Sequence, residues 1–187
     1  MKQSPFISLH SEVLGVGGGS VRKVTHNLRD AGMVTTGPNG RGAPDMVGLD
    51  AVRVFIAIVA SSSPSRAVRD VQYFGALKPD LREGRPDDTE ALGIDADTTL
   101  EQALLSIVEN RCPHNILWGE LNLRENGMAA ISCAAKEPIY QAFYPKDRTE
   151  HRAADLQSRI SVIKREGTAT LGLLHQIGFE MIGWEVE

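Results

Sequence analysis

The side chains best suited to chemistry in this chain are cationic and gather between Ser20 and Arg41. That stretch holds four Lys and Arg residues and one carboxylate, Asp30. Its cationic and imidazole side chains are Arg22, Lys23, His26, Arg29 and Arg41. Such groups donate hydrogen bonds to anions, and guanidinium groups match the geometry of phosphate and carboxylate oxygens. The stretch therefore predicts a surface that binds an anionic partner.

A helix from about Ser20 to Ala31 would position most of these side chains. Its apolar residues are Val21, Val24, Leu28 and Ala31. Their spacings of three and four place them on one stripe. At about 100° per residue, His26 falls opposite that stripe, among the cationic residues. Gly32 is expected to end the helix in the left-handed conformation.

Three glycines, Gly17, Gly18 and Gly19, precede the expected helix. Each glycine inside a helix costs about 1 kcal/mol relative to alanine. We therefore expect the helix to start late, with Ser20 as its N-cap. Alternatively, the glycines let backbone N–H groups approach a phosphate closely.

The residues after the helix predict a short β segment and a turn. Met33–Thr36 is apolar and β-branched enough to extend. Gly37–Gly40 carries a strong Gly/Pro/Asn turn signal, with Asn39 inside it and Arg41 directly after it. We therefore expect a projecting loop with an amide and a guanidinium near its tip.

The order of these features resembles a bacterial winged helix-turn-helix. Leu14-Gly15-Val16, a short turn and Ser20–Val34 (SVRKVTHNLRDAGMV) carry the resemblance, which covers about residues 1–50. In such proteins the second helix lies in the major groove of DNA and its end leads into the wing. The chain departs from the pattern at Gly17–Gly19, where relatives usually carry a Ser or Thr cap. The resemblance implies double-stranded DNA as the partner.

The resemblance also implies roles for the candidate residues. Arg22 would contact guanine edges, with Lys23 or His26 assisting. The amides and hydroxyl of Gly18–Ser20 would hold phosphates, and Arg41 would enter the minor groove or meet the DNA backbone. The expected DNA-binding residues are Gly18, Gly19, Ser20, Arg22, Lys23, His26, Arg29, Asn39 and Arg41.

The glycines also permit a rival interpretation as a dinucleotide-binding turn. That fingerprint requires G-x-G-x-x-G, but Ser20 stands at the third glycine position. It also requires an acidic residue about 20 positions further on, and Val34–Asn39 holds no carboxylate. We therefore prefer DNA binding, and a nucleotide site or a purely structural turn stay as alternatives.

Composition limits the class of protein. The net charge of −4 over 187 residues argues against a polyanion binder that uses its whole surface, although residues 1–50 carry five Lys and Arg against four acids. Cys112 and Cys133 do not make a disulfide framework, and no secretory signal is apparent. The longest apolar run, Val54–Ala60, is too short to cross a bilayer. We expect a cytoplasmic protein without membrane contact.

The whole chain predicts an α+β fold, in which the N-terminal winged helix-turn-helix is followed by helices and a small antiparallel sheet. Asp50–Ala60 is apolar nearly all round and should be a buried helix. Ser63 and Pro64 restart a helix, and Lys78–Asp97 is expected to be a solvated acidic linker. The expected domains are 1–62 for DNA binding, 63–98 for a helix and the linker, and 99–187 for dimerisation or effector binding.

The last part predicts a capped helix and then the sheet. Thr99–Gln102 is a capping box. Alternating residues from Leu117 to Leu123, the hairpin signal Asn126-Gly127 and the apolar run Ile139–Tyr144 predict three antiparallel strands. Ile160–Arg165 fits a further strand or a helix, and we favour a strand.

The chain ends in segments suited to packing. Thr168–Ile177 predicts a helix with Leu171, Leu174 and Ile177 inward. The apolar tail Gly178–Trp184 should pack on the body or on a second subunit.

No constellation of residues predicts catalysis, a metal or a cofactor. The five histidines are scattered, and Cys112-Pro113-His114 lacks a second Cys/His pair at zinc-ligand spacing. The sequence predicts a homodimeric transcriptional regulator that is not an enzyme, with any small-molecule effector left open. The chain also resembles proteins of prophages and other mobile elements, so a DNA-packaging or recombination accessory is one alternative. A protein-interaction module is another.

Overall fold

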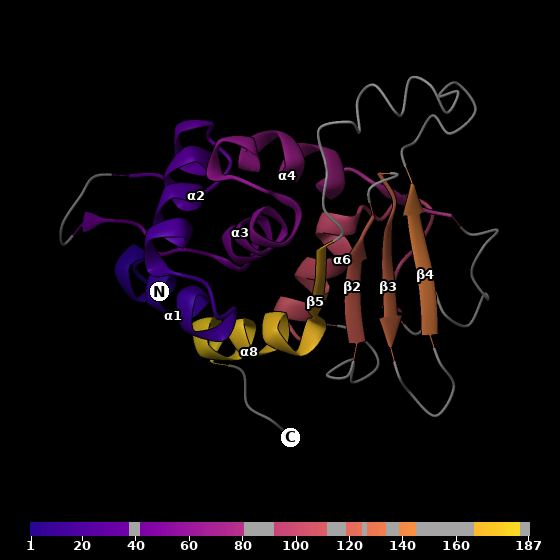
Figure 1. Ribbon diagram of the computed structural model, residues 1–187. Coiled ribbons are helices and arrows are strands. Elements are labelled where there is room, and N and C mark those ends of the chain that lie inside the picture. The colour runs from indigo at the N-terminus through magenta and orange to yellow at the C-terminus, as the bar shows by residue number, and fades with distance from the viewer. Residues whose placement is uncertain are drawn as a thin grey trace.

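The computed structural model describes residues 1–37, 42–80, 92–111, 119–124, 127–133, 139–144 and 167–183. Within them, helices and one antiparallel sheet form an α+β fold, as the sequence predicts (Figure 1). The first helices lie at one end of the molecule and the sheet lies at the other. None of the helices in these stretches is long and apolar enough to cross a membrane.

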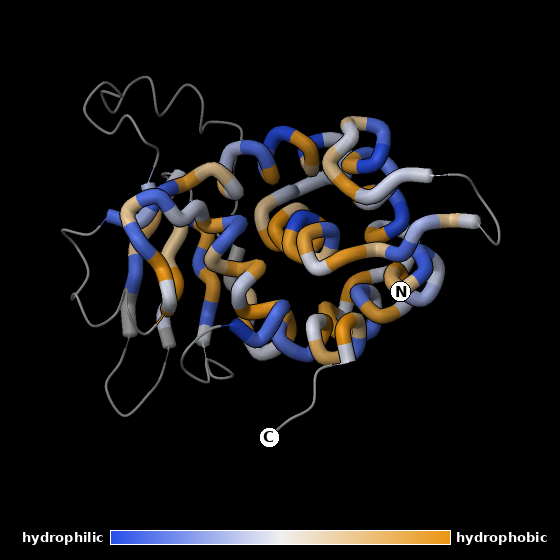
Figure 2. The backbone as a smooth tube through the Cα atoms, turned by 180° about the vertical axis from the view of Figure 1, so that it is seen from behind, coloured by the Kyte–Doolittle hydropathy of each residue, from blue (hydrophilic) through white to orange (hydrophobic). Residues whose placement is uncertain are grey.

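The helical end is built around α3. Its elements are α1 (Gln3–Val13), α2 (Gly18–Asp30), α3 (Gly48–Ala60), the 3-10 helix η2 (Pro64–Arg66) and α4 (Ala67–Gly75). α3 contacts α2, α4, α6 and α8, and nine of its thirteen residues are buried. Figure 2 shows this central helix as largely apolar. The expectation of a buried helix from Asp50 to Ala60 is confirmed, because a helix that is apolar all round needs neighbours on every side.

The sheet has the strand order β1-β4-β3-β2-β5, and every neighbouring pair is antiparallel. Its strands are β1 (Lys78–Pro79), β2 (Gly119–Leu123), β3 (Ala129–Cys133), β4 (Ile139–Tyr144) and β5 (Gly167–Thr170). Gly127 turns the β2–β3 hairpin with a φ of 78°, and its N–H donates to Arg124 O at 2.9 Å. Gly119, Leu121 and Leu123 of β2 are buried, whereas Glu120 is exposed and Asn122 is half-buried. The three antiparallel strands predicted between residues 117 and 144, and the hairpin between the first two, are confirmed where the structure describes them.

Two helices, α6 (Leu100–Val108) and α8 (Leu171–Ile182), pack on each other and on α3, and α8 also contacts β2 and β5. The predicted capping box opens α6. Gln102 N donates to Thr99 Oγ1 at 3.2 Å, and Thr99 N donates to Gln102 Oε1 at 2.7 Å. These two bonds satisfy two of the N–H groups that a helix start leaves free.

Gly178 sets the distance between α8 and the end of α6. A Cβ atom at Gly178 would lie 2.2 Å from the carbonyl oxygen of Val108. No side chain fits there without a shift of backbone. The close approach of these two helices therefore depends on glycine.

One hydrophobic core contains residues from all three expected domains. Val24, Phe74, Leu104 and Leu121 all belong to it. The boundaries expected at residues 62 and 98 therefore separate segments that share a core. The division of the chain into these three domains stays a prediction.

The last predicted helix is present with Leu171, Leu174 and Ile177 buried, but its start and part of the predicted acidic linker differ from the expectation. Leu92 and Ile94 are buried and β1 pairs with β4, so parts of the expected solvated linker belong to the core and the sheet. The helix expected from Thr168 begins at Leu171, because the preceding residues pair with β2, and it continues to Ile182 through the expected tail. The strand expected at 160–165, the segment 112–114 and Trp184 lie outside the described residues.

Candidate nucleic-acid interface

α1 and α2 are consecutive helices that contact each other and are joined by a short turn. Gly15 lies between them with a φ of 62°, in the left-handed region that favours glycine. Ser11 Oγ donates to Val16 O at 2.6 Å, and Val16 N donates to Ser11 O at 3.2 Å. The turn is thus closed by its own hydrogen bonds. These bonds fix the direction in which α2 leaves α1.

α2 begins earlier than the sequence predicts. Gly17 is the N-cap, and Ser20 N and Val21 N donate to its carbonyl oxygen at 2.8 and 3.3 Å. The expectation that Ser20 caps the helix was therefore wrong. A Cβ at Gly18 would lie 3.5 Å from Ser11 Oγ, so this first turn rests against α1. Packing on α1 outweighs the low helix propensity of the glycines.

The two faces of α2 differ sharply in burial. Its buried residues are Val21, Val24, Thr25 and Leu28. Gly19, Ser20, Arg22, Lys23 and His26 are exposed, while Gly18 and Arg29 are half-buried. Neither Arg22 nor Lys23 makes a side-chain hydrogen bond or ion pair within the described stretches. Both cations are therefore available to an anionic partner.

The C-terminal half of α2 carries a small charged network. His26 Nδ1 lies 3.1 Å from Asp30 Oδ2, and Arg29 Nη2 lies 3.2 Å from His26 Nδ1. Arg29 Nε is also 4.0 Å from Asp30 Oδ1. Asp30 thus partly offsets the charge of Arg29. The free positive charge of α2 is concentrated at Arg22 and Lys23, in its N-terminal half.

α2 ends as the sequence predicts, but the next segment does not. Gly32 has a φ of 69°, and Met33 N donates back to Leu28 O at 2.8 Å. No strand forms at Met33–Thr36, so the expected β segment was wrong. Its backbone groups bond to side chains of α3 instead of to another strand. The β-ribbon of a wing is therefore not present in residues 33–37 and 42–47.

Asp50 and Arg53 of α3 hold this segment. The buried Asp50 carboxylate accepts from Thr35 N and from Val47 N, each at 2.8 Å. Arg53 Nη1 donates to Met33 O. One α3 carboxylate therefore ties together both ends of the stretch between α2 and α3.

Arg53 is held in turn by α6. Its Nε donates to Glu101 Oε2 at 2.7 Å and its Nη2 donates to Glu101 Oε1 at 3.0 Å. These hydrogen bonds raise the pKa of Arg53 above its ordinary value, against partial burial. The sequence patterns did not predict these roles of Asp50, Arg53 and Glu101. Two charged residues in the otherwise apolar DAVRVFIAIVA are the signal that could have marked the first two.

The base of the loop between α2 and α3 is narrow. A Cβ at Gly37 would lie 2.5 Å from Pro44 Cδ, so the two sides meet at a distance only glycine permits. Met46 N donates to Met1 O at 2.7 Å, and Lys2 Nζ lies 3.5 Å from Asp45 Oδ1. The expected tip residues Asn39 and Arg41 lie outside the described residues.

His10 is a buried residue of α1 that packs under the α1–α2 pair. It is fully buried, its Nδ1 lies 2.9 Å from Phe6 O, and its ring centroid is 4.1 Å from that of Phe6. Its Nε2 has no hydrogen-bond partner in the described part of the chain. Burial lowers the pKa of His10 to about 4, so the ring is neutral near pH 7. It is a structural histidine of α1.

Comparison of the chain with models of protein families, with curated proteins and with solved structures found no match. No group of His, Cys, Asp and Glu within the described residues is arranged to hold a metal ion. Within the described residues, the features most suited to binding a partner are the exposed cationic face of α2 and the anchored loop stem beside it.

Proposed function

We propose that the protein binds double-stranded DNA through α2 and regulates transcription as a homodimer. The observation that carries the proposal is the pair Arg22 and Lys23. Both side chains are exposed and unpaired in the described structure, on the helix that follows a tight helix turn. Residues in the N-terminal half of a recognition helix are those that reach base edges in the major groove. A guanidinium can bond the two acceptors of guanine there.

The surroundings of α2 support this orientation. Val21, Val24 and Leu28 bury the opposite face, so the cationic face is the one left to a partner. Gly19 and Ser20 are exposed at the start of the helix, where backbone N–H groups and the helix dipole favour phosphate. Asp50 and Arg53 anchor the loop stem, which gives any DNA contact by the loop a fixed base.

Homodimer formation is proposed from the end of α8. Phe179 and Ile182 are three residues apart on that helix and are 42% and 48% exposed. Exposed apolar side chains at adjacent positions suit a protein contact. A sequence-specific DNA-binding protein gains affinity when a dimer binds two half-sites. Sedimentation velocity of the wild type and of Ile182→Glu should show a dimer that the variant loses, whereas a monomeric wild type would contradict this part of the proposal.

Fluorescence anisotropy with a labelled random-sequence duplex tests DNA binding. The wild type should bind at low salt, and its affinity should fall steeply as salt rises, because bound cations displace counterions from the phosphates. Arg22→Ala should weaken binding to a selected site by about 1–3 kcal/mol and relax preference at one base pair. Arg22→Ala/Lys23→Ala should lose most of the binding.

The matched control is Arg111→Ala/Arg124→Ala, which also removes two cations but lies after α6 and after β2. Its affinity should stay close to that of the wild type. If the control loses as much affinity as Arg22→Ala/Lys23→Ala, binding depends only on the net charge of the protein, and α2 is not the DNA-binding helix. Absence of binding by the wild type at low salt would refute the proposed function.

A further inference from the structure

The segment that joins α3 to α4 lies beside the cationic face of α2. Asn27 Nδ2 of α2 donates to Pro64 O at 2.7 Å, and both η2 and α4 contact α2. Figure 1 shows α4 next to one end of α2. Lys23 is one helical turn before Asn27, so it lies on the edge of α2 that faces this segment. The segment therefore borders the proposed DNA surface.

This segment is rich in groups that donate hydrogen bonds to anions. Ser62 and Ser65 are exposed, and Arg66 Nη1 donates to Ser62 Oγ at 3.2 Å. The side chain of Arg69 is 47% exposed. Residues 61–69 contain no acidic residue. Hydroxyl and guanidinium donors are those that proteins use most at DNA phosphates.

Asp70 is the nearest acid in the sequence, and it is already engaged. Its carboxylate is buried, and Oδ1 accepts from Arg69 Nε at 3.1 Å and from Arg69 Nη2 at 2.7 Å. This ion pair partly offsets the charge of Arg69, but it leaves Asp70 behind the surface and holds the exposed guanidinium in place. The Arg69 guanidinium is therefore more exposed to solvent than the Asp70 carboxylate.

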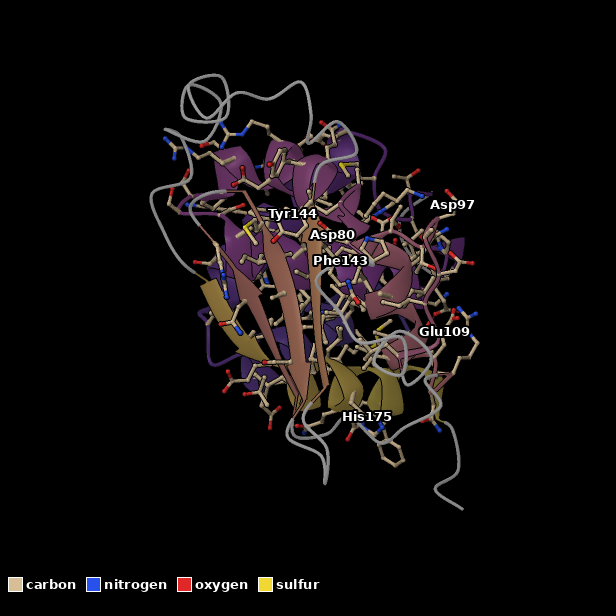
Figure 3. All side chains as sticks on the ribbon, turned by 90° about the vertical axis from the view of Figure 1, so that its right-hand side faces the viewer. Asp80, Asp97, Glu109, Phe143, Tyr144 and His175 are labelled. Carbon is tan, nitrogen blue, oxygen red and sulfur yellow. The ribbon has the colours of Figure 1, made fainter. Side chains whose placement is uncertain are left out.

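Charge is distributed unevenly over the molecule. α2 and residues 61–75 together hold five Lys and Arg side chains and two carboxylates, although the whole chain has a net charge of −4. Figure 3 shows Asp80, Asp97 and Glu109 around the sheet and α6, at the other end of the molecule in Figure 1, where Asp97 pairs with Lys78 and Glu109 with Arg111. A cationic end on an acidic protein suits a partner with closely spaced negative charges.

We propose that Ser62–Arg69 is a second edge of the DNA surface, where Arg66 and Arg69 contact the phosphate backbone beside the groove that α2 enters. This inference rests on the proposed DNA binding by α2. Phosphate contacts fix the register of a recognition helix without reading sequence. The segment therefore contributes affinity and orientation, while α2 contributes base preference.

The test is the salt dependence of DNA affinity for Arg66→Ala/Arg69→Ala. At 0.1 M salt each lost phosphate contact should lower affinity about tenfold, and the slope of log affinity against log salt should fall by about one per contact. The loss should be equal on selected and random duplexes. Arg66→Lys/Arg69→Lys keeps both charges and should restore most of the slope. Arg111→Ala/Arg124→Ala is the control and should leave the slope unchanged.

A loss of DNA affinity caused by misfolding must be distinguished from a loss of phosphate contacts. Removal of Arg69 leaves the buried Asp70 without its partner, so melting temperatures are measured for every variant, and Arg66→Ala alone tests the inference if the double variant does not fold. A variant with an unchanged slope would overturn this inference, even while Arg22→Ala/Lys23→Ala still loses binding and the proposed function stands. Failure of the wild type to bind DNA would overturn both.

Discussion

Neutral, buried His10 should make the protein lose stability in mildly acidic solution. Its pKa is about 4 in the folded protein against an ordinary value of 6.5. Each unit of difference corresponds to about 1.36 kcal/mol, so the difference of about 2.5 units corresponds to about 3 kcal/mol. The unfolded chain binds the proton more readily between these two pKa values. The free energy of unfolding should therefore be fully retained above pH 6.5 and fall as the pH drops toward 4.

The assay is urea unfolding, followed by circular dichroism at several pH values from 7 to 4.5, for the wild type and His10→Asn. Asparagine can keep the hydrogen bond to Phe6 O but does not titrate. The pKa of His175 is also lowered, by partial burial on α8, and contributes with the same sign in both proteins. The difference between the two pH profiles therefore isolates His10. Parallel profiles would refute the reasoning.

Two carboxylates with lowered pKa values, Asp45 and Asp95, do not obscure this window. The pKa values of Asp45 and Asp95 are lowered, the first mainly by a hydrogen bond from the N-terminal amine and the second mainly by one from Thr98. Their contribution is present above the ordinary value of 3.8 and is lost only as the pH falls below it. The fall in the free energy of unfolding between pH 6.5 and 4.5 is thus assigned to histidine.

Three other predictions concern glycine and the buried carboxylate. Gly178→Ala should lower the free energy of unfolding by about 1–3 kcal/mol or more, because its Cβ would meet Val108 O at 2.2 Å, and an unchanged urea midpoint would contradict the helix contact. Gly19→Ala has open space and should instead raise the melting temperature, with a gain of up to about 1 kcal/mol. Asp50→Asn should cost about 1–3 kcal/mol, since one of two backbone N–H groups loses its acceptor, and hydrogen exchange at Thr35 should accelerate. Exchange that stays slow at Thr35 would show that another group holds the loop stem.

Local patterns in the sequence predicted the elements that depend on neighbouring residues. The capping box at Thr99, the end of α2 at Gly32 and the hairpin at Gly127 each follow from side-chain or backbone preferences within a few positions. The alternating burial of β2 and the helical spacing in α2 are equally local. The cationic face of α2 was predictable for the same reason.

Elements that depend on distant partners were not predictable in this way. Met33–Thr36 has the composition of a strand, but Asp50 and Arg53 take its hydrogen bonds. β1 has only two residues and exists because β4 offers an edge, more than 60 positions later. The early start of α2 depends on α1. In each case a tertiary contact outweighs a weak local preference.

The narrow base of the loop between α2 and α3 has a consequence for how this protein could change over evolution. Gly37 and Pro44 already hold the two ends together, and Asp50 fastens the chain on both sides of them. The entropy of closing a loop grows only slowly with its length. Insertions, deletions and substitutions between these ends should therefore cost little stability. The segment is therefore a place where the sequence can vary, or a new loop can be grafted by design, while the helices on either side stay the same.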